Sequence, residues 1–483
     1  MNTRYTDEAN VQIVIALMKH HGVRKVVASP GATNITFVAS IQQDPFFEIY
    51  SAADERSAAY IACGMAAESG EPVALSCTGA TASRNYLPGL TEAYYRKLPV
   101  LAITSSQHLG RVGHMVPQVI DRSCSQNDVC KVSVQVPGVA SDEDRRSCED
   151  AVNGALLELR RRGGGPVHLN LVTGYSPNFD VAELPPVRAV DRLVPGDSLP
   201  SLAGRRVAVY AGAHRAWSER LTAAVDAFCA AYDAVVVCDH TSNYRGPYRA
   251  LGSLLITQSS YPHPCKRVDV MVHIGEVSGA YAAPSAAETW RVSPDGELRN
   301  AFGGLRYVFE MQEEEFFETY AAAAGDAAPQ HSLAGQWQAE DAKLREKIPE
   351  LPFSNAWIAQ QTAGRLPEGS VLHLGILNSL RCWNFFETPD SVLGYSNTGG
   401  FGIDGCVSSL IGASLAAPGK LFFGVVGDLA AFYDLNSLGN RHVGPNVRLI
   451  VVNNGVGTEF KNYNHKAAAF GDDADAFIAA RGH

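Results

Sequence analysis

The chain lacks the marks of membrane, secreted and nucleic-acid-binding proteins. No apolar run approaches the roughly 18 residues that a membrane-spanning helix needs. The opening residues, MNTRYTDEAN, have neither the basic start nor the apolar core of a signal peptide. The longest basic run is the three arginines 160–162, and the formal net charge is -10. Neither feature is typical of a nucleic-acid-binding protein. We therefore expect a cytoplasmic protein with neither nucleic acid nor membrane as a partner.

Paired cysteines are also missing. The chain has ten cysteines but no C-x-x-C pair and no paired ligand spacing. This pattern argues against a zinc site or a disulfide framework. We expect reduced thiols that fill the core, where free cysteines are usually found.

What is present is an alternation of helical and strand patterns typical of α/β proteins. Apolar residues recur at helical spacing over 9–21, 56–69 and 87–95, and short apolar strands follow or separate them at 23–28, 72–77, 99–104 and 166–171. Continuous apolar strands between amphipathic helices indicate a parallel sheet that is covered on both faces. The sequence predicts an α/β fold of this type.

The length and the prolines indicate three such domains. The chain has 483 residues, and about 150 residues are typical of one domain. Prolines 177, 185, 186, 195 and 200 mark one linker, and prolines 349 and 352 bound a second. We predict domains at 1–180, 200–335 and 352–483. The middle domain has strands expected at 206–210, 234–238 and 268–275, a helix at 218–232 and largely helical sequence over 310–350; the last has strands at 370–374, 421–426 and 447–452.

Two polar motifs follow neighbouring strands of the last domain. Gly427-Asp428 comes after one strand, and Asn453-Asn454 ends the next. Ligands of parallel sheets bind beyond the carboxyl ends of the strands, and carboxylate and amide oxygens suit Mg²⁺. A helix expected over 434–438 would add its dipole. The alternative is that both motifs are ordinary turns.

An acid also stands at the head of an apolar helix in the first domain. Glu55 lies in the run Asp54-Glu55-Arg56, directly before Ser57-Ala58-Ala59. The helix dipole favours an acid in the first turn, so a purely structural cap is the alternative to a functional role.

Taken together, the motifs resemble those of thiamine-diphosphate-dependent enzymes. The resemblance rests on the following segments: Ser29-Pro30-Gly31, Thr78-Gly79-Ala80-Thr81-Ala82, Asn85-Tyr86-Leu87-Pro88, Gln118, Gly165-Pro166-Val167-His168, Tyr395-Ser396-Asn397, Gly402-Ile403-Asp404-Gly405, Gly427-Asp428-Leu429 and Tyr433-Asp434-Leu435-Asn436. It covers the whole chain, in the order pyrimidine-binding, central and diphosphate-binding domain. Its best fit is to the menaquinone-pathway synthases that add 2-oxoglutarate to isochorismate.

The resemblance implies a cofactor site of thiamine diphosphate and Mg²⁺. Glu55 would activate the cofactor by contacting its aminopyrimidine ring, and His114 and Gln118 would be further catalytic residues, although His114 fits a loop histidine equally well. Asp428, Asn454 and the Val456 carbonyl would hold the metal. The other cofactor contacts implied are Ser29, Pro30, Gly31, Thr78, Asn85, Asn397, Gly402, Ile403, Gly427 and Leu429. Related diphosphate-binding domains continue through another strand and helix, so this domain is short or its tail is absent from the chain.

The substrate arginines of those synthases are replaced here. Ala32-Thr33 stands for Ser-Arg, and Gln107, Trp383 and Thr398 each stand for an arginine that would hold a carboxylate. We therefore expect decarboxylation of a smaller 2-oxo acid, pyruvate first, with transfer to a carbonyl acceptor, as in acetolactate synthases. The alternatives are the synthase reaction itself and a catalytically silent subunit. The expected substrate contacts are Gln107, Ser379, Arg381 and Trp383, the last of which fits a core residue equally well.

Two further expectations concern other cofactors and assembly. No G-x-G-x-x-G follows a strand, and the central domain offers only Ala211-Gly212-Ala213, which argues against a flavin- or nicotinamide-dependent oxidoreductase. The resemblance implies a homodimer or homotetramer with active sites at the subunit interface. The loop over 458–465 would be a lid over the cofactor or simply an exposed loop.

Overall fold

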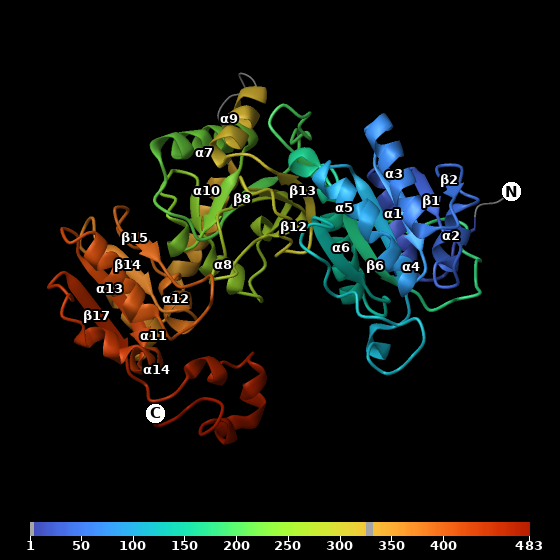
Figure 1. Ribbon diagram of the computed structural model, residues 1–483. Coiled ribbons are helices and arrows are strands. Elements are labelled where there is room, and N and C mark those ends of the chain that lie inside the picture. The colour runs from blue at the N-terminus through green and yellow to red at the C-terminus, as the bar shows by residue number, and fades with distance from the viewer. Residues whose placement is uncertain (1–3, 325–331) are drawn as a thin grey trace. The chain divides into compact units, whose positions relative to one another are not determined.

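A computed structural model describes residues 4–324 and 332–483. It contains three parallel-strand sheets separated by helices, which confirms the predicted α/β class (Figure 1). The residues group into two compact units, Met1–Arg192 with Leu298–Arg306, and Leu193–Glu297 with Tyr307–His483. The first unit holds one sheet and the second the other two, apart from strands at the boundary. The exact limits of three domains stay a prediction.

The first sheet has the strand order β2-β1-β3-β4-β6-β5. Its strands are β1 (Lys25–Ala28), β2 (Glu48–Ser51), β3 (Val73–Cys77), β4 (Val100–Ser106), β5 (Val132–Val136) and β6 (Val167–Val172). Strands β3, β4 and β6 are buried along their whole length, as their continuous apolar runs predicted. The edge strands β2 and β5 are partly exposed and lack such runs, which is why the sequence pattern missed them.

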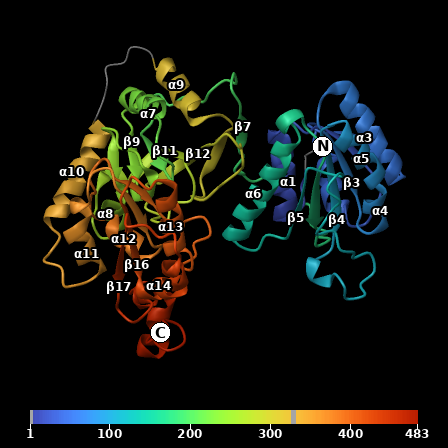
Figure 2. The ribbon, with the colours of Figure 1, turned by 60° about the vertical axis from the view of Figure 1, so that its left-hand side comes forward.

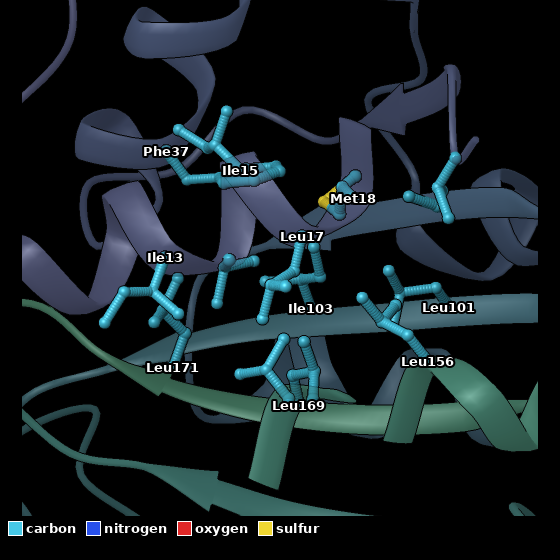
Figure 3. Close-up of a cluster of buried hydrophobic side chains, with 14 of the residues drawn as sticks. Ile13, Ile15, Leu17, Met18, Phe37, Leu101, Ile103, Leu156, Leu169 and Leu171 are labelled. Carbon is cyan, nitrogen blue, oxygen red and sulfur yellow. The ribbon is translucent and has the colours of Figure 1, made fainter. Parts of the chain in front are cut away.

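Helices cover both faces of this sheet (Figure 2). Helices α1 (Ala9–His20) and α6 (Asp142–Glu158) lie on one face, and α3 (Glu55–Ser69), α4 (Thr81–Asn85) and α5 (Leu87–Tyr95) lie on the other; α2 (Ile35–Ile41) follows β1. Ile13 and Leu17 of α1 pack against Ile103 and Leu169 of the sheet (Figure 3). This buried cluster anchors the first face.

Small residues bring α3 and α5 unusually close on the other face. A Cβ atom added to Gly89 of α5 would lie 2.4 Å from the Ala59 Cβ of α3. The alanines of α3 and Leu90 of α5 belong to one buried cluster with Leu75 of β3. This packing fixes α3, and with it the position of Glu55 at its first residue.

The central sheet of the second unit has the order β10-β9-β8-β11-β12-β13-β7. Its strands are β7 (Asp191–Leu193), β8 (Val207–Ala211), β9 (Val235–Cys238), β10 (Arg249–Leu251), β11 (Arg267–Ile274), β12 (Ser285–Val292) and β13 (Leu305–Phe309). Its helices are α7 (Glu219–Tyr232), α8 (Gly252–Thr257), α9 (Glu313–Ala323) and α10 (Ser332–Glu346). The helical prediction for 310–350 is thus met by α9 and α10, while 325–331 lies outside the described residues. An aromatic cluster of Phe228, Phe316 and Phe317 packs α7 against α9.

The third sheet has the order β15-β14-β16-β17. Its strands are β14 (Val371–Leu374), β15 (Leu393–Tyr395), β16 (Phe422–Gly427) and β17 (Val447–Val452), and its helices are α11 (Asn355–Thr362), α12 (Asn378–Trp383), α13 (Cys406–Ala416) and α14 (Asp428–Tyr433). Gly427 pairs with Val452, so β16 and β17 end side by side and deliver their polar motifs to one edge, as predicted. The helix expected over 434–438 is present as a 3-10 helix over Leu435–Gly439, and a regular helix, α14, begins earlier, at Asp428.

The cysteines agree with the expectation of reduced thiols that fill the core. All ten cysteines are free and eight of them are buried. Within 4–324 and 332–483, no helix has the length and apolar character needed to cross a bilayer.

Candidate active site

The Asp428 carboxylate organises the edge of the third sheet. It lies in the first turn of α14, where the helix dipole favours a negative charge, and the residue is only 5% exposed. Its Oδ2 accepts hydrogen bonds from the backbone N–H groups of Asn454 at 2.9 Å and Gly455 at 2.5 Å. Its Oδ1 accepts one from Leu429 at 2.9 Å. One carboxylate thus fixes the loop after β17 to the end of β16.

The donors around this carboxylate suit a hard cation. The Asn454 side chain is exposed, and its amide oxygen accepts the Val456 N–H at 3.2 Å. Gly455 between them has a φ of +67°, a conformation that glycine adopts at little cost. A carboxylate, an amide oxygen and a main-chain carbonyl form an oxygen donor set of the kind that Mg²⁺ binds. The residues present therefore fit a divalent metal, and the assignment of Asp428, Asn454 and Val456 as its ligands stays a prediction.

The chain beyond β17 folds back on the same edge. The Gly482 N–H donates to the Gly455 carbonyl at 3.0 Å. The His483 Nε2 atom lies 3.6 Å from Asp428 Oδ1, and its ring meets the Phe432 ring edge-on at 5.4 Å between centroids. Asp428 is therefore enclosed by its own helix, the loop after β17 and this returning segment.

The expected lid loop is attached to α12 in this structure. It begins as a 3-10 segment over Thr458–Lys461. Asn378 Nδ2 donates to Thr458 Oγ1 at 2.9 Å, and Arg381 Nη1 lies 2.5 Å from Glu459 Oε2. Arg381, an expected substrate contact, thus has its charge paired with Glu459.

The other predicted residues of this unit divide into edge and core positions. Asn397 and the Gly402-Ile403 pair lie in the loop between β15 and α13, at the same carboxyl edge as Asp428, and Ile403 packs against Val407 and Ala430. Their contact with a cofactor stays a prediction, as it does for Gly427 and Leu429, which flank Asp428 at this edge.

Trp383 and Ser379 are buried side chains of α12. Trp383 has no exposed surface and belongs to the core cluster with Leu374 and Val425. Ser379 is 4% exposed. Trp383 therefore lies in a core environment, which was the alternative to its expected role as a substrate contact. Neither Trp383 nor Ser379 presents an open surface to a substrate.

Glu55 is the first residue of α3 but does not cap it. The cap is its neighbour Asp54, whose carboxylate accepts the Arg56 N–H at 3.0 Å. Glu55 is half-buried, and within 4–324 and 332–483 its carboxylate has no hydrogen-bonding or ion-pair partner. Burial raises the pKa of the Tyr86 hydroxyl, and the nearby Glu55 charge adds to that effect. A carboxyl group that neither caps nor pairs is available to a ligand.

The Ser29-Pro30-Gly31 turn lines a hollow at the carboxyl end of β1. Together with Ile35 and Ser51 it bounds a space of about 390 Å³. A Cβ atom on Gly31 would lie 2.6 Å from the Thr78 Cβ, so only glycine allows these two predicted cofactor loops to touch. Asn85, at the end of α4, is exposed.

Thr33 joins the loops of this edge, a role that the sequence did not reveal. The side chain is 2% exposed. Its hydroxyl is hydrogen-bonded to the Thr78 hydroxyl, donates to the Ser105 carbonyl at 3.0 Å and accepts the Gly79 N–H at 3.2 Å. Its own carbonyl accepts from Thr173 Oγ1 at 2.9 Å. Thr33, which the resemblance led us to expect in place of an arginine, is therefore a structural junction.

The remaining predicted residues of the first unit lie on the loop after β4. His114 and Gln118 are exposed, and Gln118 has a φ of +64°, which is uncommon outside glycine. Gln107 accepts a hydrogen bond from Arg111 at 2.5 Å and donates to the Tyr175 hydroxyl at 3.3 Å. Their catalytic and substrate roles stay predictions.

Two acids of the second unit were not foreseen as site residues. Glu459 pairs with Arg381, as described above. Asp434 is buried, and its Oδ2 accepts the Ser408 N–H at 2.5 Å, so it caps α13 from a distant part of the chain. The motif Tyr433-Asp434-Leu435-Asn436 drew attention to Asp434, but a partner so far away in sequence leaves no local signal.

Comparisons with known proteins show which sequences this chain is similar to. Residues 10–125 match the family described as "Thiamine pyrophosphate enzyme, N-terminal TPP binding domain". A 2-succinyl-5-enolpyruvyl-6-hydroxy-3-cyclohexene-1-carboxylate synthase of Bacteroides fragilis is 31% identical, covering 94% of this chain and 84% of that protein. The proteins of the same name from Bacteroides thetaiotaomicron and Porphyromonas gingivalis are 30% and 27% identical, over 94% and 95% of this chain and 84% and 85% of theirs.

Proposed function

Because the chain belongs to the thiamine-diphosphate-dependent enzymes, in the branch of the 2-succinyl-5-enolpyruvyl-6-hydroxy-3-cyclohexene-1-carboxylate synthases, we propose that it decarboxylates a 2-oxo acid and adds the remaining acyl unit to a second substrate. The observation that carries this proposal is similarity to synthases of one name over 94% of the chain. Thiamine diphosphate with a divalent metal is the cofactor of this family, and magnesium is the metal that we propose.

The residues of the two units would divide the work as follows. When bound, thiamine diphosphate supplies an electron sink for the loss of carbon dioxide from a 2-oxo acid. Asp428, Asn454 and the Val456 carbonyl would hold magnesium against its diphosphate. The unpaired Glu55 carboxyl would share a proton with a nitrogen of its pyrimidine ring. His114 and Gln118 would deliver or remove the proton at the substrate.

Our first candidate is the synthase reaction after which the similar proteins are named. The earlier preference for an acetolactate-synthase-like enzyme has less support, because the similar proteins carry the synthase name. The acceptor of that reaction, isochorismate, would then be the second substrate, and 2-oxoglutarate the donor.

A smaller donor such as pyruvate, with a carbonyl acceptor, is the second candidate. It is favoured by the environments of the replaced arginine positions: Thr33 and Thr398 are 2% and 6% exposed, and Trp383 is fully buried. Such side chains cannot reach a second carboxylate on the donor. Arg381 would be the remaining guanidinium for the one carboxylate of pyruvate.

Carbon dioxide release from purified enzyme with thiamine diphosphate and Mg²⁺ distinguishes these candidates. Release from 2-oxoglutarate that rises with isochorismate supports the synthase, whereas release from pyruvate alone supports the second candidate. If no 2-oxo acid releases carbon dioxide, the chain is a catalytically silent subunit and the proposal fails.

We also propose that the enzyme is a homodimer or a homotetramer with its sites at the subunit interface. Glu55 belongs to the first unit and Asp428 to the second, and in the resembling enzymes the cofactor lies between the first domain of one subunit and the last domain of another. Sedimentation in the presence of cofactor and Mg²⁺ tests this: a monomer would contradict it.

A further inference from the structure

A small cavity lies beside the first sheet, and none of the predicted cofactor residues lines it. Its volume is about 40 Å³. Residues of β4, α4, α5, β6 and the following loops surround it, among them Thr104, His168, Arg84, Arg122 and Cys124, with apolar walls from Leu87, Leu90 and Val129. A water molecule needs roughly 10–15 Å³ of such space, so the cavity accommodates a group of a few atoms.

Arg122 enters this cavity from the loop after β4 without a counter-charge. The residue is 6% exposed. Its Nη2 donates to Asn170 Oδ1 at 2.7 Å, but its Nε and Nη1 atoms are buried without any hydrogen-bond partner. Within 4–324 and 332–483, the guanidinium forms no ion pair with a carboxylate; its only other contact is a weak one from Nη2 to the Ser105 carbonyl at 3.5 Å. A buried cation left in this state is strongly unfavourable, so a missing partner is expected.

A second guanidinium stands at the same cavity. Arg84 is exposed, and its Nη2 donates to the Asp121 carbonyl at 3.0 Å rather than to a carboxylate. Burial, with a smaller contribution from the positive charge of Arg84, lowers the pKa of Arg122 to about 10, so Arg122 remains protonated at neutral pH. The lining of the cavity thus holds two positive charges and no acid, although the Asp121 carboxylate lies near Arg84 outside the cavity.

The other polar lining residues are neutral. Burial lowers the pKa of His168 to about 3, and its two ring nitrogens are hydrogen-bonded at 2.7 Å to Thr104 and Ser133. The Thr104 hydroxyl is thus held beside the cavity by a neutral ring. The cavity offers N–H donors and positive charge, and its apolar walls exclude competing water.

We propose that this space, the Arg122 cavity, binds a carboxylate group. A carboxylate has three heavy atoms and one negative charge, which matches the small volume and the unused N–H groups of Arg122 better than a phosphate would. Cys124 and Gln126 are exposed at its rim, so a ligand larger than the cavity can place its carboxylate inside and leave the rest outside. The ligand is thus either a free small acid or one end of a larger acid.

The site is separate from the cofactor residues but touches one of their loops. A Cβ atom on Gly79 would lie 3.6 Å from Arg122 Nη1 and 3.1 Å from the Ser105 carbonyl. The bound carboxylate would therefore lie next to the turn that follows Thr78. The proposal concerns binding by the first unit and stands whether or not the proposed reaction is correct.

The test uses the full chain and acids that carry no 2-oxo group, so that turnover does not interfere. Acetate and succinate are titrated at constant ionic strength by calorimetry, and the rate of iodoacetamide labelling of the exposed Cys124 is followed in parallel. We expect saturable binding that slows the labelling. Arg122→Gln should weaken the binding by about tenfold or more, since hydrogen bonds to charged groups are worth this much.

Two further variants make the result decisive. Arg84→Gln alters an exposed side chain and should weaken binding severalfold, which tests the site even if Arg122→Gln does not fold. Arg96→Gln removes the same charge from an exposed residue that does not line the cavity, and should bind acetate like the parent. Tighter binding of succinate than of acetate identifies one end of a larger acid, and equal binding identifies a free small acid. The absence of saturable binding, equal binding by parent and Arg84→Gln, or equal competition by sulfate would overturn the proposal.

Discussion

The backbone N–H of Asn454 donates to Asp428 Oδ2 at 2.9 Å, although 26 residues separate them in the chain. The bond links the ends of two neighbouring parallel strands, β16 and β17. The same carboxylate holds the Gly455 N–H, so the loop that carries the predicted metal ligands depends on one side chain.

Asp428→Asn should therefore lower activity by two routes. It removes a negative charge from the metal site, and it replaces an acceptor that two N–H groups require. We expect carbon dioxide release to fall by at least about tenfold, because even residues that only orient a metal ligand cost 10- to 100-fold when changed. The fall should be partly reversed by excess Mg²⁺. Asp473→Asn, an exposed acid of the same unit, is the control and should behave like the parent enzyme.

Glu55 and Asp54 should separate catalysis from stability. Glu55→Gln removes a carboxyl group that caps nothing, so we expect turnover to fall by about 10²- to 10⁴-fold, the usual share of proton transfer, with little change in unfolding. Asp54→Ala removes the real cap and should cost about 1 kcal/mol of stability while turnover is kept. Steady-state kinetics and urea unfolding of both variants check this. Unchanged turnover in Glu55→Gln would refute the catalytic role.

Arg381 and Glu459 should affect the binding of the donor acid in opposite directions. Their ion pair neutralises the guanidinium that we expect to hold a substrate carboxylate. Arg381→Met should raise KM for the 2-oxo acid more than it lowers kcat, whereas Glu459→Gln should lower KM by releasing the guanidinium. Progress curves of both variants, recorded at one fixed cofactor concentration, test whether KM rises in Arg381→Met and falls in Glu459→Gln. If both variants raise KM equally, the pair serves only to hold the loop.

Buried His168 should make the protein less stable in mild acid. Burial lowers its pKa to about 3 in the folded state, while an unfolded histidine titrates near 6.5. Below about pH 6.5 the unfolded state binds a proton that the folded state refuses until about pH 3, so stability is full above that window and is lost as pH falls through it. The slope from this one group approaches roughly 1.4 kcal/mol per pH unit. Denaturant unfolding from pH 7 to 4 should show a shallower slope in His168→Gln.

The exposed His442 supplies the control for that measurement. His442→Gln should leave the pH slope of the parent unchanged. An equal slope in the parent and in His168→Gln would mean that other groups cause the acid sensitivity.

Much of the fold follows from the sequence because buried parallel strands require continuous apolar runs. Strands β3, β4 and β16 lie where those runs predicted them, and the edge strand β17 was also found because its sequence is apolar although it is only partly buried. The edge strand β2, which is largely exposed, lacks such a run and was missed. The helix expected over 434–438 forms as a 3-10 helix rather than a regular one, and the bond of Asp434 to the distant Ser408 leaves no local signal in the sequence.

The predicted metal ligands were accessible to sequence reasoning for a different reason. Asp428 and Asn454 follow strands that end at one edge, so topology alone brings them together. No comparable rule predicts contacts between loops from the sequence. The pairing of Arg381 with Glu459 and the burial of Trp383 depend on how α12 packs, which no spacing in the chain reveals.

Thr33 also constrains how this protein can change over generations. A single Thr33→Arg substitution would place a long charged side chain where the Thr33 hydroxyl now bonds Thr78 and Ser105. The loss of these bonds would destabilise the protein before the arginine could bind any new ligand. Neighbouring loops would have to loosen first. The order of substitutions would therefore matter, because an arginine at position 33 is tolerated only after the contacts of Thr33 have been replaced.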